Sequence, residues 1–123
     1  MARKDFIDGL RVLGLEPQEL EGQRVVLRYR IPVGAFIGQE IMLGFTVGDD
    51  FPFNPPTGPR VSPRLFPIHP GPDIPHPHGG VHEAKEYGES WEYWSRPFAG
   101  WAATDRSVAT YMRHIRDLFA RIP

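Results

Sequence analysis

The chain has 123 residues, with fourteen Lys and Arg against fifteen Asp and Glu, so its net charge is -1 at pH 7. This balance gives no field that attracts nucleic acid or an anionic membrane, and we expect neither as a partner. No apolar run reaches the roughly eighteen residues of a membrane span, and the first residues lack a secretory signal, so we expect a cytoplasmic protein. There is no cysteine, which excludes disulfides, thiolate metal sites and thiol nucleophiles.

The length and the 41% share of hydrophobic residues are typical of one domain, which we expect to span residues 1–123. Apolar residues at 6, 7, 10 and 13 recur at helical spacing, which predicts a short amphipathic helix over 5–14 with Gly14 as its cap. Residues 24–31 and 41–47 are rich in β-branched and aromatic side chains. They predict two antiparallel strands joined by a turn around Gly34 and Gly38.

Proline shapes the middle of the chain. The segment 51–56, Phe-Pro-Phe-Asn-Pro-Pro, has three prolines among its six residues, so we expect a rigid extended crossing and not a central strand. A third short strand is expected around 59–62, at an edge of the sheet because Pro59 and Pro63 flank it. Five prolines and three glycines in 67–80 predict a long loop within the same domain.

The C-terminal segment predicts the longest helix. Thr104 or Asp105 is expected to cap it. The apolar stripe that follows consists of Val108, Tyr111, Met112, Ile115, Leu118, Phe119 and Ile122. A helix, an antiparallel meander, a long loop and a terminal helix together predict an α+β fold.

At this point the sequence resembles a known family. The segment 51–56 looks like the Tyr-Pro-x-x-Pro-Pro signature that follows the second strand of ubiquitin-conjugating enzymes. The His-Pro steps at His69 and His76, and Trp101 before the terminal helix, are also similar to that family. Trp-Ser-Arg at 94–96 resembles the divergent prokaryotic branch of the superfamily, and the resemblance covers residues 5 to 122.

The resemblance implies the ubiquitin-conjugating-enzyme fold, with a ubiquitin-like protein and an activating enzyme as partners and no cofactor. The chain departs from the family in two respects. It lacks the active-site cysteine, and its only asparagine is Asn54, so the family's asparagine that stabilises the oxyanion is missing.

A serine can replace the cysteine only if a base activates it. Ser95 lies six residues before Trp101, near where the family's cysteine falls, and is the first candidate nucleophile; Ser90 is the alternate. Arg96 would offer positive charge to an oxyanion, and His82, with His78 behind it, would act as the base. The structural alternatives are a capping or turn serine at 95 and an ion pair of Arg96 with Asp105 or with a terminal carboxylate.

Three histidines offer a different chemistry. His76, His78 and His82, with Glu83, have a spacing that would suit zinc or another divalent ion. The proline and glycine around them provide no regular element to fix the ligands, so the metal site stays the lesser alternative.

Two functional hypotheses follow. In the first, the protein is a transferase of a bacterial-type ubiquitin-like conjugation pathway that carries the modifier as an oxyester on Ser95 or Ser90. In the second, it is a catalytically inert variant domain that binds a ubiquitin-like protein or a peptide. An exposed Ser95 hydroxyl beside a histidine favours the first, and a serine without a base favours the second.

Overall fold

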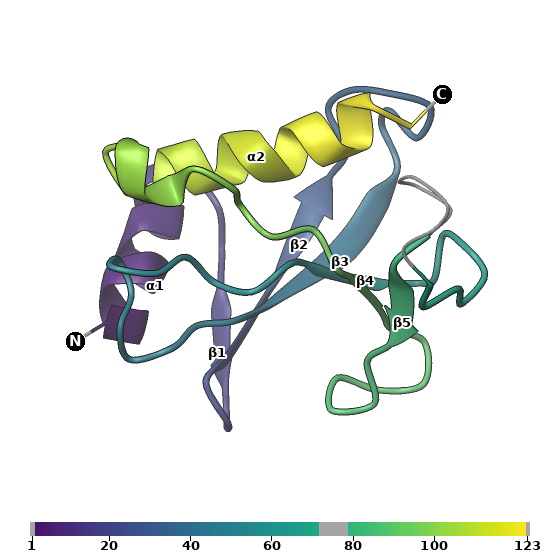
Figure 1. Cartoon of the computed structure of the whole chain (residues 1–123), viewed down its shortest axis with the longest axis horizontal. Coiled ribbons are helices and arrows are strands. Elements are labelled where there is room, and N and C mark those ends of the chain that lie inside the picture. The colour runs from purple at the N-terminus through teal and green to yellow at the C-terminus, as the bar shows by residue number, and fades with distance from the viewer. Residues whose placement is uncertain (1, 72–78, 123) are drawn as a thin grey trace.

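The computed structural model describes residues 2–71 and 79–122 and has an α+β architecture (Figure 1). Within these residues, the strands form one antiparallel sheet in the order β1-β2-β3-β4-β6-β5. The elements are α1 Ala2–Val12, β1 Gln18–Leu20, β2 Arg24–Arg30, β3 Glu40–Thr46, β4 Arg60–Ser62, β5 Val81–Glu83, β6 Glu92–Trp94, a 3-10 turn η1 Trp101–Ala103, and α2 Val108–Ala120. The prediction of an α+β fold is confirmed.

The two long strands form the centre of the sheet. Strands β2 and β3 pair from Arg24 opposite Thr46 to Arg30 opposite Glu40, which confirms the two predicted strands to within one residue. Alternation on β3 places Leu43 and Phe45 among the buried residues, as expected for a sheet with one face on the core.

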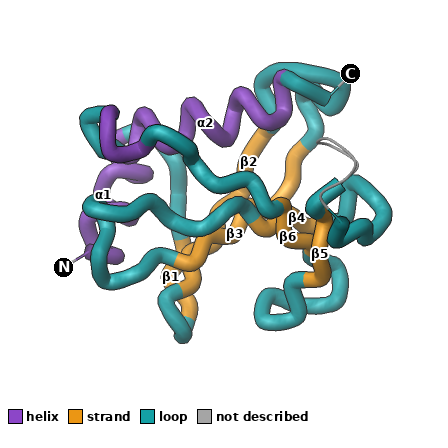
Figure 2. Tube along the Cα trace, in the orientation of Figure 1, coloured by secondary structure: helices purple, strands orange, loops and turns teal. Residues whose placement is uncertain are grey.

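Both helices pack on one face of this sheet (Figure 2). The ring of Phe6 in α1 lies 5.6 Å from Phe45 of β3 and 6.0 Å from Tyr111 of α2, in edge-to-face contacts. Further along α2, the ring of Phe119 lies 5.9 Å from Tyr29 of β2 and 5.2 Å from Trp94 of β6. The apolar stripe predicted for the terminal helix is therefore its core-facing side.

The helix ends differ in how well they were predicted. Gly14 has a φ of 84°, and its amide bonds to Arg11 O at 2.9 Å, which confirms the predicted cap of α1. The expected cap of α2 was wrong: Ser107, not Thr104 or Asp105, accepts the bond from Thr110 N at 3.1 Å. Asp105 instead accepts bonds from Ser107 N at 3.1 Å and Thr110 Oγ1 at 2.7 Å, so it supports the cap from outside the helix.

The first part of the proline-rich crossing is a turn over residues 49–54, which corrects the prediction of an extended segment there. Phe53 N and Asn54 N both bond to Asp50 O, and Asn54 Nδ2 donates to Asp50 Oδ2 at 2.6 Å. The Phe51–Pro52 bond is cis, and Pro52 O accepts a 2.8 Å bond from Trp101 Nε1. The crossing is thus held against the segment that leads into α2.

Strand β4 lies inside the sheet, so the predicted edge position was wrong. Arg60 pairs with Tyr93, and Val61 pairs with Glu92, which places β6 beyond β4. Strand β5 then forms the edge, and His69 makes an isolated bridge with its first residue, Val81. In the part of the chain that the structure describes, no helix has the length and apolar character needed to cross a membrane.

Candidate functional site

The candidate nucleophile Ser95 lies directly after β6, at the sheet edge formed by β5. In this edge pair Val81 lies opposite Trp94, and His82 lies opposite Tyr93. Val81 and Trp94 are buried on the core side, so alternation places the half-buried His82 and Tyr93 on the outer face. Ser95 N bonds to Gly80 O at 2.9 Å, which extends the pairing by one residue. Ser95 therefore shares the outer face with His82.

Ser95 and His82 do not form the expected acid–base pair. The two residues are diagonal neighbours across the β5–β6 pair, a relationship in which only a suitable side-chain rotamer brings the groups together. The His82 ring packs instead on Tyr93, with 5.7 Å between ring centroids. Across residues 2–71 and 79–122, no hydrogen bond joins the Ser95 hydroxyl to a histidine. The described residues thus supply no base for this serine.

Arg96 makes hydrogen bonds that hold the edge of the sheet together. Its Nη1 donates to Ser95 O at 2.8 Å, and its Nη2 donates to Gly79 O. Gly80 is buried against the same guanidinium, because a Cβ at this position would lie 2.5 Å from Arg96 Nη1. Burial lowers the pKa of Arg96 from its ordinary value. These donors are committed to backbone carbonyls, and an oxyanion would have to displace them.

His114 approaches this segment from α2, and sequence reasoning missed it. Its Nε2 lies 3.1 Å from Arg96 O; because a carbonyl only accepts, this nitrogen carries the proton. The ring centroid lies 4.7 Å from that of Phe98. Burial lowers the pKa of His114, so the neutral ring is favoured. The sequence did contain a signal for this residue: His114 follows Tyr111 by three positions, which puts it beside the apolar stripe of the helix.

Ser90 belongs to a different place. It is exposed before β6, and its Oγ lies 2.9 Å from Ser62 Oγ of β4. Nearby, Arg64 Nε donates to Trp91 O at 2.9 Å. The structure therefore does not bring Ser90 together with Ser95, and a hydroxyl is a poor base for another hydroxyl.

The predicted metal ligands divide between described and undescribed parts of the chain. His76 and His78 lie outside the described residues, whereas His82 is on β5. Within the described ranges, no group of three His, Asp or Glu side chains is arranged to hold a metal ion.

Glu92 is the buried charged residue of this region, and sequence reasoning missed it as well. Its side chain is 0% exposed, and its Oε1 accepts bonds from Leu65 N at 2.9 Å, Phe66 N at 3.3 Å and Trp94 Nε1 at 2.9 Å. Burial raises the pKa of this carboxyl, and these bonds oppose the rise. The sequence signal for a buried carboxyl was its spacing: Glu92 lies two residues before Trp94, so in a strand both point to the same face. Glu92 fastens the segment after β4 to β6.

Aromatic side chains cover the outer face of the sheet beside this edge. Tyr87 and Trp91 lie over Gly44, whose missing side chain leaves room for their rings. The guanidinium carbon of Arg60 lies 4.3 Å from the ring centroid of Tyr93 and 5.5 Å from that of Tyr87. Together with His82, these residues form a half-exposed surface, which we call the aromatic face.

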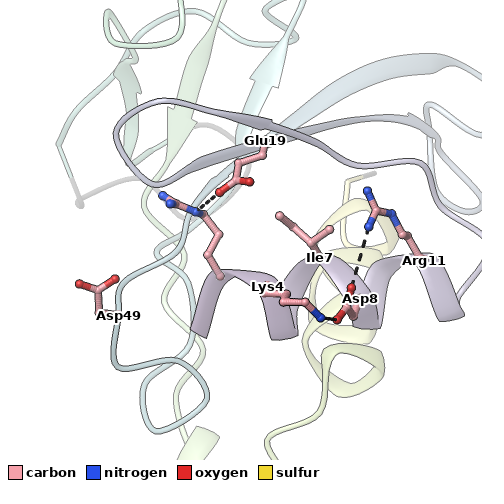
Figure 3. Close-up of a pocket in the computed structure, with 7 residues that line it drawn as sticks. Lys4, Ile7, Asp8, Arg11, Glu19 and Asp49 are labelled. Atoms are coloured by element: carbon pink, nitrogen blue, oxygen red, sulfur yellow. Dashed lines mark hydrogen bonds and ion pairs between the residues drawn. The ribbon is translucent and has the colours of Figure 1, made fainter. Parts of the chain in front are cut away.

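A charged hollow of about 370 Å³ lies elsewhere, beside α1 (Figure 3). Arg3 Nε pairs with Glu19 Oε2 at 2.5 Å, and Lys4 Nζ pairs with Asp8 Oδ2 at 2.7 Å. Arg11 Nη1 lies 3.9 Å from the other oxygen of Asp8. Exposed pairs of this kind contribute little to stability, and here they engage the carboxylates of Glu19 and Asp8.

Comparison with known proteins adds no relative. No family model, curated protein or solved structure matches the chain.

Proposed function

We propose that the protein is a ubiquitin-conjugating-enzyme-like domain that binds a ubiquitin-like protein without forming a covalent bond to it, in a bacterial-type conjugation pathway. What supports the fold assignment is the order of elements: α1, the antiparallel strands β1 to β3, the Pro-rich crossing at 51–56, β4, a long loop, β5 and β6, and a helix on the core side of the sheet. This order agrees with the resemblance of the sequence to that family.

One observation carries the proposal of binding without transfer. In the described residues, neither the Ser95 nor the Ser90 hydroxyl bonds to a histidine or a carboxylate; Ser90 Oγ lies against Ser62 Oγ. A serine hydroxyl is a weak nucleophile unless an adjacent base activates it, and the chain has no cysteine to use instead. Arg96 is also held by two carbonyls, so it is not poised to stabilise an oxyanion.

The aromatic face supplies a surface for such binding. Tyr93, Trp91 and His82 are half-exposed on the outer face of the sheet, and Arg60 stacks on Tyr93. Aromatic and arginine side chains contribute most to protein interfaces, because they bury large areas and still offer polar groups. We therefore expect the ubiquitin-like protein to contact this face.

The second candidate is the oxyester carrier. It is favoured by the half-exposed position of Ser95 on the same face as His82, next to the guanidinium of Arg96. A rotation of the His82 side chain away from Tyr93 would be needed to bring the two groups into contact.

One experiment separates the two candidates. The protein is incubated with a ubiquitin-like protein, its activating enzyme and ATP, and mass spectrometry looks for an adduct that resists thiol reductants but yields to hydroxylamine. Ser95→Ala and Ser90→Ala are run in parallel. We expect no adduct while the activating enzyme charges itself; an adduct that one of these variants loses would replace the binding proposal with the oxyester carrier.

Binding itself is measured by NMR titration with the ubiquitin-like protein. We expect shifts at the aromatic face, weakened about tenfold or more by Tyr93→Ala, as for an interface anchor worth at least 1–2 kcal/mol. The matched control is Phe53→Ala, which removes an exposed aromatic ring at the 51–56 crossing, outside the aromatic face. Absence of both binding and adduct would reject a role with this class of partner.

A further inference from the structure

The edge of β2 that faces away from β3 is paired with another strand over only part of its length. Strand β1 pairs with β2 from Leu20 opposite Arg24 to Gln18 opposite Val26 and goes no further. At the other end of β2, Ile31 N donates to Gln39 O at 2.9 Å on the β3 side. Because hydrogen-bonding direction alternates along an antiparallel strand, the main-chain groups at positions 28 and 30 point away from β3. Among the described strands, none pairs with that edge beyond Val26.

An apolar hollow of about 400 Å³ lies beside this open edge. Its lining comes from the segment before β1, from β2 and from α2: Leu13, Leu15, Tyr29, Ala109, Met112, Arg113, Arg116 and Asp117. In Figure 1 the chain that leads into β1 and strand β2 separate as they approach α2. Leu13 is 43% exposed at the mouth, although it is a large apolar side chain. Tyr29 lies between the open positions 28 and 30 and also lines the hollow, so the edge and the hollow adjoin; we call them together the edge groove.

The lining of the hollow carries two exposed arginines, Arg113 and Arg116 of α2. Arg28 is also exposed, but it alternates with the core-facing Tyr29 and so lies on the outer face of β2, beside Glu40 and Ser62. In the described part of the chain no ion pair engages these three side chains. Asp117 is the acidic residue of the lining, and Arg30 is paired with Glu40 at 3.3 Å. Two arginines against one aspartate in the lining, with Arg28 across the open edge on the outer face, favour an acidic ligand.

We propose that the edge groove binds an extended acidic segment of a partner protein by strand addition. The main chain of this segment pairs with the free groups of Arg28 and Arg30. An apolar side chain of the segment enters the hollow beside Tyr29 and Met112. Carboxylates on the same face of the segment meet Arg113 and Arg116, and carboxylates on its other face meet Arg28. Main-chain pairing provides affinity in this mode, and pockets for alternate side chains provide selectivity. The groove lies at the opposite end of the sheet from Ser95 and His82, so this binding is independent of the proposed function.

Hydrogen exchange tests the open edge in the free protein. We expect the amides of Arg28 and Arg30 to exchange at least roughly tenfold faster than those of Leu27 and Tyr29, which bond to β3. Equal protection of the four amides would show that the edge is already occupied and would overturn the proposal.

The binding probe is a short fluorescent peptide with one central Leu, Val beside it, and Glu residues that fall on both faces of the extended chain. We expect saturable binding that slows exchange at Arg28 and Arg30. Two control peptides isolate the causes: one carries N-methyl groups on the amides that face β2, and the other has Lys in place of Glu. Each is expected to bind about tenfold or more weakly, because the first loses main-chain hydrogen bonds and the second faces like charges. No binding, or equal binding of the N-methylated peptide, overturns strand addition.

Protein variants locate the site. Leu13→Glu places a carboxylate at the mouth of the hollow. We expect it to weaken peptide binding about tenfold, because the apolar side chain of the peptide loses its contact with Leu13. Val12→Glu is the matched control, because Val12 is 86% exposed and lies outside the lining. Equal effects of the two variants would contradict the location.

The same variant tests whether a second copy of the chain occupies the groove. If the free protein dimerises and Leu13→Glu abolishes the dimer, the occupant is a second copy and the peptide is rejected. Leu13→Glu should leave contact with a ubiquitin-like protein unchanged.

Discussion

The indole nitrogen of Trp94 donates a 2.9 Å hydrogen bond to Oε1 of Glu92, two residues earlier on the same face of β6. The same oxygen accepts bonds from Leu65 N and Phe66 N, so one buried acceptor serves donors from β6 and from the segment after β4. A buried carboxylate is costly unless donors of this kind surround it. The relationship explains how an acidic residue can lie in the core next to Trp94.

Removing this acceptor should destabilise the fold. Glu92→Ala leaves the amides of Leu65 and Phe66 and the indole N–H without their partner, and each unsatisfied buried donor costs about 1–3 kcal/mol. We expect the free energy of unfolding to fall by at least about 2 kcal/mol, measured by urea denaturation. Glu89→Ala is the matched control, because Glu89 is exposed before β6. Equal losses in the two variants would contradict a role for the buried acceptor.

Glu92 should also make stability depend on pH. Burial raises the pKa of Glu92 above its ordinary value of 4.5, so the folded protein holds this proton more tightly than the unfolded chain. The contribution to stability is full below pH 4.5 and is lost as the pH rises through the folded pKa. Glu92→Gln keeps Oε1 as an acceptor and cannot ionise, so it should remove this decline. Denaturation series across this pH window, run on both proteins, should show the difference; parallel curves would contradict the assignment.

The contact between Gly80 and Arg96 gives a prediction about the edge of the sheet. Gly80→Ala adds a Cβ at a φ of 69°, 2.5 Å from Arg96 Nη1, so it combines backbone strain with a clash. Strain of this kind alone costs about 1–2 kcal/mol. The control is Gly38→Ala, at a φ of 87° but with no atom within 4 Å. Thermal unfolding should show a larger decrease in Tm for Gly80→Ala than for Gly38→Ala. Adding Arg96→Ala to Gly80→Ala should recover part of that decrease, because the clash is then removed. If the effects of Gly80→Ala and Arg96→Ala simply add, the two residues are not in contact.

The sequence predicted the long elements because their patterns run over several turns or alternations. Strands β2 and β3 each have seven residues, and α2 has thirteen, with a stripe that faces the core. Strands β1, β5 and β6 have three residues each, too few for alternation to show. Their pairing depends on neighbours distant in the sequence, such as Val61 opposite Glu92. The edge position expected for β4 failed for this reason, since its second neighbour was not visible in the sequence.

The site was less predictable than the fold. Ser95, Arg96 and His82 do lie at one edge of the sheet, as their closeness in the chain suggested. Their contacts depend on rotamers and on partners such as Gly79, Tyr93 and the backbone, which composition does not reveal. His114 reaches Arg96 only because α2 crosses the sheet, a tertiary relationship without a local signal.

His114 should make the protein lose stability on mild acidification, a dependence opposite in sign to that of Glu92. Burial lowers the pKa of His114 below its ordinary value of 6.5, so the unfolded chain binds this proton more readily than the folded protein. The contribution to stability is full above pH 6.5 and is lost as the pH falls toward the folded pKa.

His114→Gln tests this dependence, because the glutamine amide can still donate to Arg96 O and carries no titrating group. We expect the loss of unfolding free energy below pH 6.5 to become smaller in this variant than in the parent protein, measured by urea denaturation at a series of pH values. His82→Gln, on the outer face of the sheet, is the matched control. If His82→Gln removed the dependence and His114→Gln did not, the proton would bind at the aromatic face, and the buried ring on α2 would not be its site.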